Sequence, residues 1–167
     1  MPTFLVSQEL YYLQAMFTPL QNTLRPLAVR AGENDVNKAF NILFDLHELI
    51  FRDDCGIHSH WLAFLYSSYA RYLIDYNKPD ETVKAFKQAF VHAKKVAEFA
   101  NGTSEKINTS PFTDLIKQPE YLKFNPDRVV RQLLDMLTNE HKFKVLHENA
   151  DFAALIEEVE TWIAERG

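Results

Sequence analysis

The segment YSSYARYLIDYNKPDETVKAFKQAFVHAK, residues 66–94, has the pattern of one complete helical hairpin. Two runs with apolar residues every three or four positions flank the turn sequence Asn-Lys-Pro-Asp at 77–80, whose residue types end and restart helices. Small residues at Ala70, Thr82 and Ala89 allow two antiparallel helices to approach closely. Larger residues then fill the groove that the pair shares with a neighbouring pair: Tyr66, Tyr69, Leu73 and Phe86.

This spacing resembles that of a tetratricopeptide-type repeat. Repeats of this kind stack into a curved surface that binds other molecules and rarely performs chemistry. The resemblance implies an all-α fold of antiparallel helical hairpins, stacked into a short right-handed array and closed by a C-terminal helical cap. It points to binding or regulation more clearly than to a target.

The composition agrees with a helical domain. The chain has 167 residues, of which 47% are hydrophobic, enough for one domain with a substantial core. Only 4 glycines are present, and the 7 prolines lie mostly between periodic segments. We therefore predict a single domain over 1–167, with an N-terminal helix at 1–17, two hairpins at 18–101 and the cap at 102–167. Individual helices are expected at 3–17, 20–31, 35–52, 58–76, 80–100, from 125–127 onward, 143–146 and 151–165.

The N-terminal helix carries a narrow apolar seam. Val6, Leu10, Leu13 and Phe17 follow one another at spacings of four and three, as in a coiled coil. One interpretation is a helix face that packs on the rest of the domain. The other is a seam through which two copies form a homodimer.

Aromatic residues gather on the first helix of the hairpin. Tyr66, Tyr69, Tyr72 and Tyr76 are spread around that helix, so they cannot all face one core. Some are expected to pack between hairpins, and others, such as Tyr72 and Tyr76, to line a surface that binds a protein or peptide. Arg71 lies among them and could pair with a ligand carboxylate. Its more ordinary partner is Asp75, four residues further on.

One cluster could hold a metal ion. Cys55, His58 and His60 form a Cys-x-x-His-x-His sequence between two helices, and a nearby aspartate could be a fourth ligand. No second ligand pair stands at a recognisable spacing elsewhere, so we assign no metal site and no cofactor. The chain also lacks a Gly-rich phosphate loop, Gly-x-Ser-x-Gly and His-Glu-x-x-His. We therefore expect a protein that is not an enzyme.

Charge and cysteine content bear on partners and location. The formal net charge is −5 and no basic block stands out, so direct binding of nucleic acid is not expected. No apolar run approaches the roughly 20 residues of a membrane span. A single cysteine excludes an internal disulfide and suits a reducing cytoplasm.

A second resemblance concerns the C-terminal half. The sequence Asn-Thr-Ser-Pro-Phe at 108–112, with Asp114-Leu115, is followed by Phe143-x-x-Leu146-x-x-Asn149-x-x-Phe152. Both are similar to the tetratricopeptide-like domain of bacterial lambda-repressor-like (Xre-type) helix-turn-helix transcription regulators, over roughly residues 61–162. Residues 1–31 depart from the family, because they lack a helix-turn-helix spacing and a polar or basic recognition helix.

The second resemblance implies the regulatory half of such a regulator, without its DNA-binding domain. Its expected role is the sensing of a peptide or small ligand, dimerisation, or both. The alternative is a free-standing adaptor that binds a segment of another protein.

Overall fold

The computed structural model describes residues 22, 32–51, 58–100 and 127–166. These residues form helices joined by short connections, and no strand occurs among them, so the all-α prediction is confirmed for this part of the chain. The structure divides into two compact units, and each is described by itself below. The helix predicted at 3–17 lies outside the described residues, and so does the helix predicted at 20–31 apart from residue 22, which is helical. The single domain stays a prediction.

The first unit contains α2, Glu33–Phe51, which agrees with the predicted helix at 35–52. Acidic residues in its first turn, Glu33 and Asp35, favour a helix start because the N-terminal end of a helix carries partial positive charge. Its buried face follows helical spacing and consists of Val36, Phe40, Leu43 and His47.

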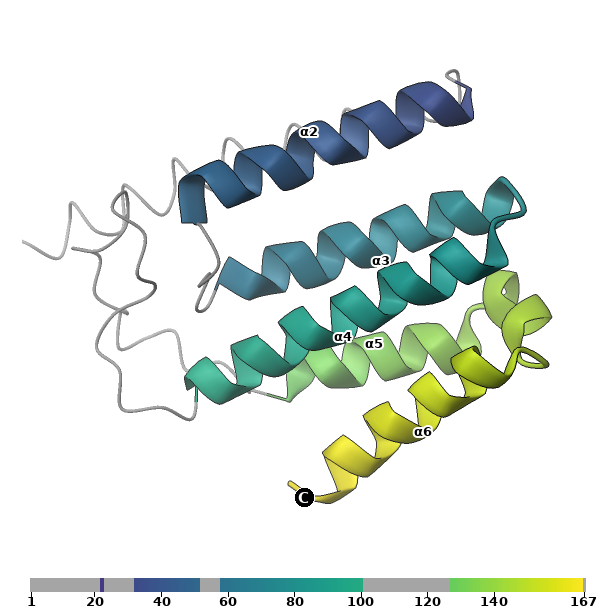
Figure 1. The fold of residues 1–167 in the computed structure, drawn as a ribbon. Helices are drawn as coiled ribbons and strands as arrows, with labels where there is room; N and C mark the ends of the chain where they lie inside the picture. Colours follow the sequence, from purple (N-terminus) through teal and green to yellow (C-terminus); the bar gives the residue numbers. More distant parts are fainter. Residues whose placement is uncertain (1–21, 23–31, 52–57, 101–126, 167) are drawn as a thin grey trace, which may run out of the picture. The chain divides into compact units, whose positions relative to one another are not determined.

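The second unit contains the remaining helices, and Figure 1 shows them running lengthwise beside one another. Each agrees with a predicted segment, and their bounds are α3 Ser59–Asp75, α4 Pro79–Ala100, α5 Arg128–Asn139, the 3₁₀ helix η2 His141–Leu146, and α6 Ala150–Ala164. Helix α4 runs antiparallel to α3, and α6 runs antiparallel to α5. The unit therefore contains two antiparallel hairpins, α3–α4 and α5–α6.

The turn between α3 and α4 is a Schellman motif. The backbone N–H of Lys78 donates to the carbonyl of Leu73 and that of Asn77 donates to Ile74, each at 3.0 Å. Asn77 has a positive φ of 58°, which asparagine tolerates better than most residues. Pro79 then occupies the first position of α4, where its missing N–H costs nothing.

Small residues lie where the two helices of this hairpin pack together. Ala70 on α3 and Ala89 on α4 are completely buried, and so is Thr82. The Thr82 hydroxyl donates to the carbonyl of Lys78 at 2.7 Å, so burial leaves that hydroxyl satisfied. The close approach expected at these three positions is consistent with their burial.

The second hairpin repeats the orientation of the first. Lys87 contacts Asp151 at 3.2 Å and Lys94 contacts Glu158 at 3.4 Å. Because a step of seven residues along α4 matches a step of seven along α6, these two helices run parallel, as Figure 1 also shows.

One apolar core joins the two hairpins. Phe86 of α4 lies edge-on to Phe143 of η2, with ring centroids 4.8 Å apart, and 6.2 Å from the ring of Phe152 in α6. All three rings are fully buried. Burying an aromatic side chain of this size contributes about 2–3 kcal/mol, so the two hairpins depend on each other for stability.

The Phe-x-x-Leu-x-x-Asn-x-x-Phe sequence has a direct structural explanation. In a 3₁₀ helix, residues three apart lie on the same face, so Phe143 and Leu146 both point into the core. Asn149 then caps α6, since its side-chain oxygen accepts the N–H of Phe152 at 3.1 Å. The three-residue period therefore turns the chain from α5 into α6 while keeping its apolar residues buried.

Candidate functional site

The aromatic residues of α3 do not form one surface. Tyr66 is half-buried, packs against the core, and stacks almost parallel on the ring of His92 in α4, with centroids 5.6 Å apart. Tyr69 also packs against the core. These two side chains therefore take part in packing between helices, which the sequence left open.

Tyr72 and Tyr76 are half-buried and lie on one stripe of α3 with Tyr69, at spacings of three and four. All three take part in interactions within the protein. Their hydroxyls and partly exposed rings are suited to contact a ligand, and their role in binding stays a prediction.

Arg71 is held by a residue that sequence reasoning missed. Its guanidinium binds the carboxylate of Glu140 through both Nε, at 3.1 Å to Oε2, and a second nitrogen that contacts Oε1. The expected pairing of Arg71 with Asp75 is wrong. Asp75 instead accepts from Lys142 Nζ at 2.7 Å, and the same ammonium donates to the Arg71 carbonyl at 3.0 Å.

This ion-pair cluster of Arg71, Asp75, Glu140 and Lys142 joins the end of α3 to the junction between α5 and η2. Arg71 and Glu140 expose 29% and 35% of their side chains, so solvent and solutes can reach them. Each of the two elements contributes one cation and one anion to the cluster, and each cation pairs with the anion of the other element. This arrangement favours one register of the second hairpin on the first. The sequence alone carries no signal for it, because 69 residues separate Arg71 from Glu140.

Phe64 is a further residue that sequence reasoning did not single out as exposed. It lies seven residues before Arg71 on α3 and is 51% exposed. Among the described residues, it is the aromatic member of the set of large apolar side chains that face solvent. A single exposed phenyl ring is common on protein surfaces, and its apolar face is open to contact.

His92 has a strongly shifted pKa. Burial, and secondly the positive charge of Lys95, lowers the pKa of His92 from 6.5 to about 4. The buried Nδ1 atom has no hydrogen-bond partner. A neutral imidazole stacked on Tyr66 is a packing group, and no nucleophile or carboxylate accompanies it in the described contacts.

The candidate metal ligands are only partly described. Cys55 lies outside the described residues. The buried ring of His58 lies 4.9 Å from Trp61, and the ring of His60 lies 5.3 Å from it, so both histidines pack on the indole. The described ranges contain no group of three or more histidine, cysteine or carboxylate side chains placed to hold a metal ion.

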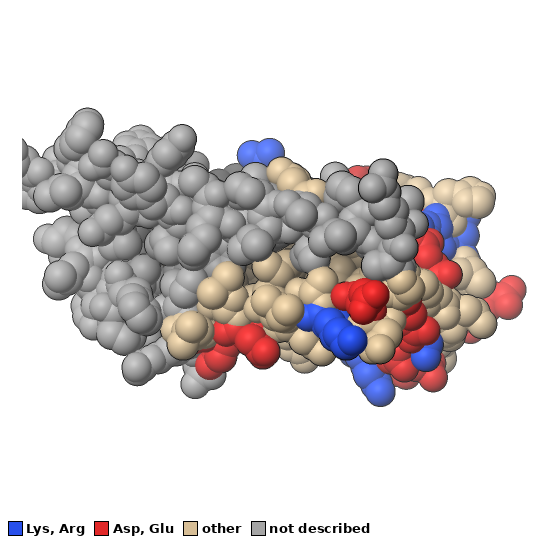
Figure 2. Space-filling view, turned by 90° about the horizontal axis from the view of Figure 1, so that it is seen from above, with Lys and Arg blue, Asp and Glu red and all other residues tan. Residues whose placement is uncertain are grey.

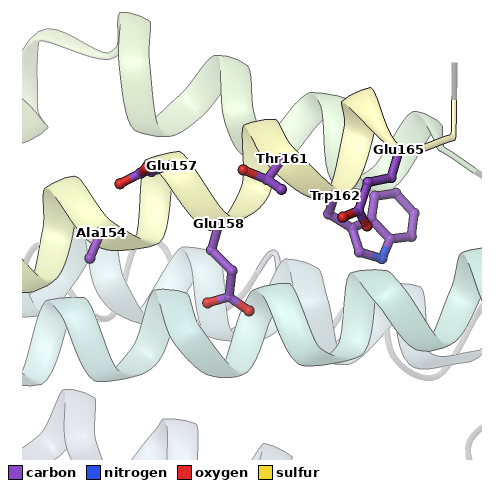
Figure 3. A pocket seen from close by; sticks show the side chains of 6 residues that line it. All are labelled: Ala154, Glu157, Glu158, Thr161, Trp162 and Glu165. Carbon is purple, nitrogen blue, oxygen red and sulfur yellow. The ribbon is translucent and has the colours of Figure 1, made fainter.

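A shallow hollow of about 450 Å³ lies on the outer face of α6 (Figure 3). Its lining consists of Ala154, Glu157, Glu158, Thr161, Trp162 and Glu165. Glu157, Glu158 and Glu160 are exposed to solvent. Glu158 binds Lys94, and the guanidinium of Arg166 stacks 4.2 Å from the ring of Trp162, so cations of the protein itself occupy part of this surface.

Lys, Arg, Asp and Glu side chains are interspersed on the described part of the face shown in Figure 2, without a broad area of one sign. None of the described helices combines the length and apolar composition that crossing a membrane requires. The residues of the predicted dimer seam, Val6, Leu10, Leu13 and Phe17, lie outside the described residues.

Comparisons with protein-family models, with curated proteins and with solved structures gave no match for this chain. Function is therefore inferred from the fold and from the surface residues described above.

Proposed function

We propose that this chain is a non-catalytic protein-interaction domain of the tetratricopeptide-like type, and that it acts as the regulatory half of a transcription regulator. The observation that carries the proposal is the repeated orientation of the two hairpins around one core. Hairpins that repeat in this way form extended surfaces whose contacts are mostly with other proteins.

The packing of the hairpin supports this proposal. The burial of the residues that suggested a repeat is compatible with such a repeat: Ala70, Thr82 and Ala89 are completely buried, Leu73 and Phe86 belong to the core, and Tyr66 and Tyr69 pack against it. The outer face of α6 is polar, as the last helix of a repeat array requires for solubility. The right-handed sense of the array, which the resemblance implies, belongs to this proposal.

The test is a selection of peptides from a random display library on the intact chain. We expect an enriched peptide family whose binding weakens roughly tenfold in Tyr72→Ala, because Tyr side chains commonly dominate such contacts. The matched control is Glu160→Ala on the outer face of α6, which should bind as the wild type does. The proposal fails if no peptide family is enriched, or if the two variants lose binding equally.

A further inference from the structure

One stripe of α3 faces away from the core and combines apolar and charged side chains. Phe64, Ser68, Arg71 and Asp75 follow one another at spacings of four, three and four, so they lie along one side of the helix. Phe64 and Asp75 are exposed, and Ser68 and Arg71 are half-buried. We call these four residues the α3 stripe.

The cation of the α3 stripe is already bound by a carboxylate from another element. Glu140 lies between α5 and η2 with an extended backbone, at φ −70° and ψ 119°, so its side chain belongs to a connection rather than to a helix. Two parallel contacts between a guanidinium and a carboxylate are the arrangement in which arginine recognises acidic side chains. Lys142 adds a second cation beside Arg71.

Exchange of this carboxylate for one from a partner is physically inexpensive. About a third of each side chain of the Arg71–Glu140 pair is exposed, so the pair is not sealed in the core. An incoming carboxylate would leave Arg71 paired, and Glu140 would move toward water. The exchange replaces one two-pronged pair of Arg71 by another, so a partner that adds one apolar contact can compete with Glu140.

We propose that the α3 stripe binds a helical segment of a partner protein, and that Glu140 occupies the place of the partner's acidic side chain until that segment arrives. The proposal rests on the proposed function and specifies its partner. The carboxylate of the partner binds Arg71, and an apolar side chain of the partner packs on Phe64.

The geometry of the stripe sets the pattern of the partner. Seven residues of helix separate Phe64 from Arg71, which corresponds to about 10.5 Å along the axis. A partner helix places two side chains at the same separation, on one face, when they too are seven residues apart. The expected partner therefore carries a Leu or similar residue and a Glu at that spacing.

The test uses two roughly 18-residue helical peptides with blocked ends, long enough to be helical alone. One carries Leu and, seven residues later, Glu; the other carries Gln in place of that Glu. Their affinities for the intact chain are measured by fluorescence anisotropy. We expect the Glu peptide to bind about tenfold more tightly, because a charged acceptor strengthens the hydrogen bonds of arginine.

Two variants separate exchange from simple loss of structure. Arg71→Gln should abolish the preference for the Glu peptide. Glu140→Gln and Glu140→Ala should raise the affinity of the protein for the Glu peptide about threefold or more. In these variants no internal carboxylate competes for Arg71, so a larger fraction of the protein can bind the peptide. Glu157→Gln removes the same charge from the outer face of α6 and should change nothing.

The proposal is overturned if the two peptides bind equally, if neither binds, or if the Glu140 variants bind the Glu peptide no more tightly than the wild type. Its failure is distinguishable from failure of the proposed function. Peptides enriched by display that bind independently of Arg71 would leave an interaction domain and remove only the exchange with Glu140.

Discussion

Ala70 and Ala89 have no accessible surface, and both belong to the core that α3 and α4 share. Three additional carbon atoms at either position have no free space to occupy. We therefore expect Ala70→Leu and Ala89→Leu each to lower the free energy of unfolding by about 1–3 kcal/mol through overpacking. The measurement is urea denaturation followed by circular dichroism.

The matched control is Ala154→Leu, an identical change at an exposed position of α6. It should alter the free energy of unfolding by less than about 0.5 kcal/mol. Equal stability of all three variants and the wild type would mean that α3 and α4 do not pack through these alanines.

His92 makes the stability of the protein depend on pH. Its pKa is about 4 in the folded protein, against 6.5 for a histidine that is fully exposed to water, so the unfolded chain binds more protons between these values. Stability from this residue is present above pH 6.5 and is lost as the pH falls from about 6.5 to about 4. We expect His92→Gln to lose less stability than the wild type between about pH 7 and about pH 4.5.

The control for this comparison is His141→Gln, because His141 is exposed at the start of η2. Urea midpoints of the three proteins at both pH values provide the measurement. If His92→Gln and the wild type lose the same stability on acidification, the protonation of His92 does not contribute to acid unfolding.

At the scale of the element, the start of α6 depends on one side chain. Asn149 accepts the backbone N–H of Phe152, and Phe152 belongs to the core joining the two hairpins. We expect Asn149→Ala to lower the free energy of unfolding by about 1 kcal/mol, because a helix N-terminus loses its capping acceptor. Asn149→Ser keeps an acceptor and should stay close to the wild type. Thermal or urea unfolding of both variants would detect the difference, and equal loss in both would contradict a capping role.

Helix positions in the described chain could be predicted from the sequence, because apolar spacing and turn residues act over short distances. The ends of α3 and α4 fall within one residue of the prediction, since the Asn-Lys-Pro-Asp turn fixes both. The Asn149 cap was missed, because the helix was predicted to begin at Asp151, one residue after its actual start at Ala150. The burial of His47 could not be predicted, since a histidine in an amphipathic pattern gives little indication of which side it faces.

At the scale of the whole molecule, contacts between distant elements could not be predicted. Arg71 was matched with Asp75 because residues four apart on a helix can pair. In the folded protein Glu140 and Lys142 arrive from the α5–η2 junction and bind both residues. Which charges pair depends on which elements lie side by side in the fold. Apolar periodicity predicts that two helices pack together, but it does not specify which charged residues meet at the edges of their interface.

One interpretation of the predicted seam of Val6, Leu10, Leu13 and Phe17 is that two copies of the chain form a homodimer through it. A regulator that responds to a ligand by changing the spacing of two DNA-binding domains must be a dimer. If this seam pairs two copies, Leu10→Glu combined with Leu13→Glu should convert a dimer into a folded monomer, because buried like charges oppose association. Light scattering on a sizing column gives the mass, and circular dichroism reports the fold.

The control variant places two glutamates on the opposite side of the predicted helix, as Gln8→Glu with Ala15→Glu, and should remain a dimer. A wild-type monomer would remove the dimerisation role and favour an adaptor that binds a single partner segment. Unfolding of the seam variant, with the control intact, would show that these leucines belong to the core. In that case the regulatory response would have to reach a DNA-binding domain through a change within one chain.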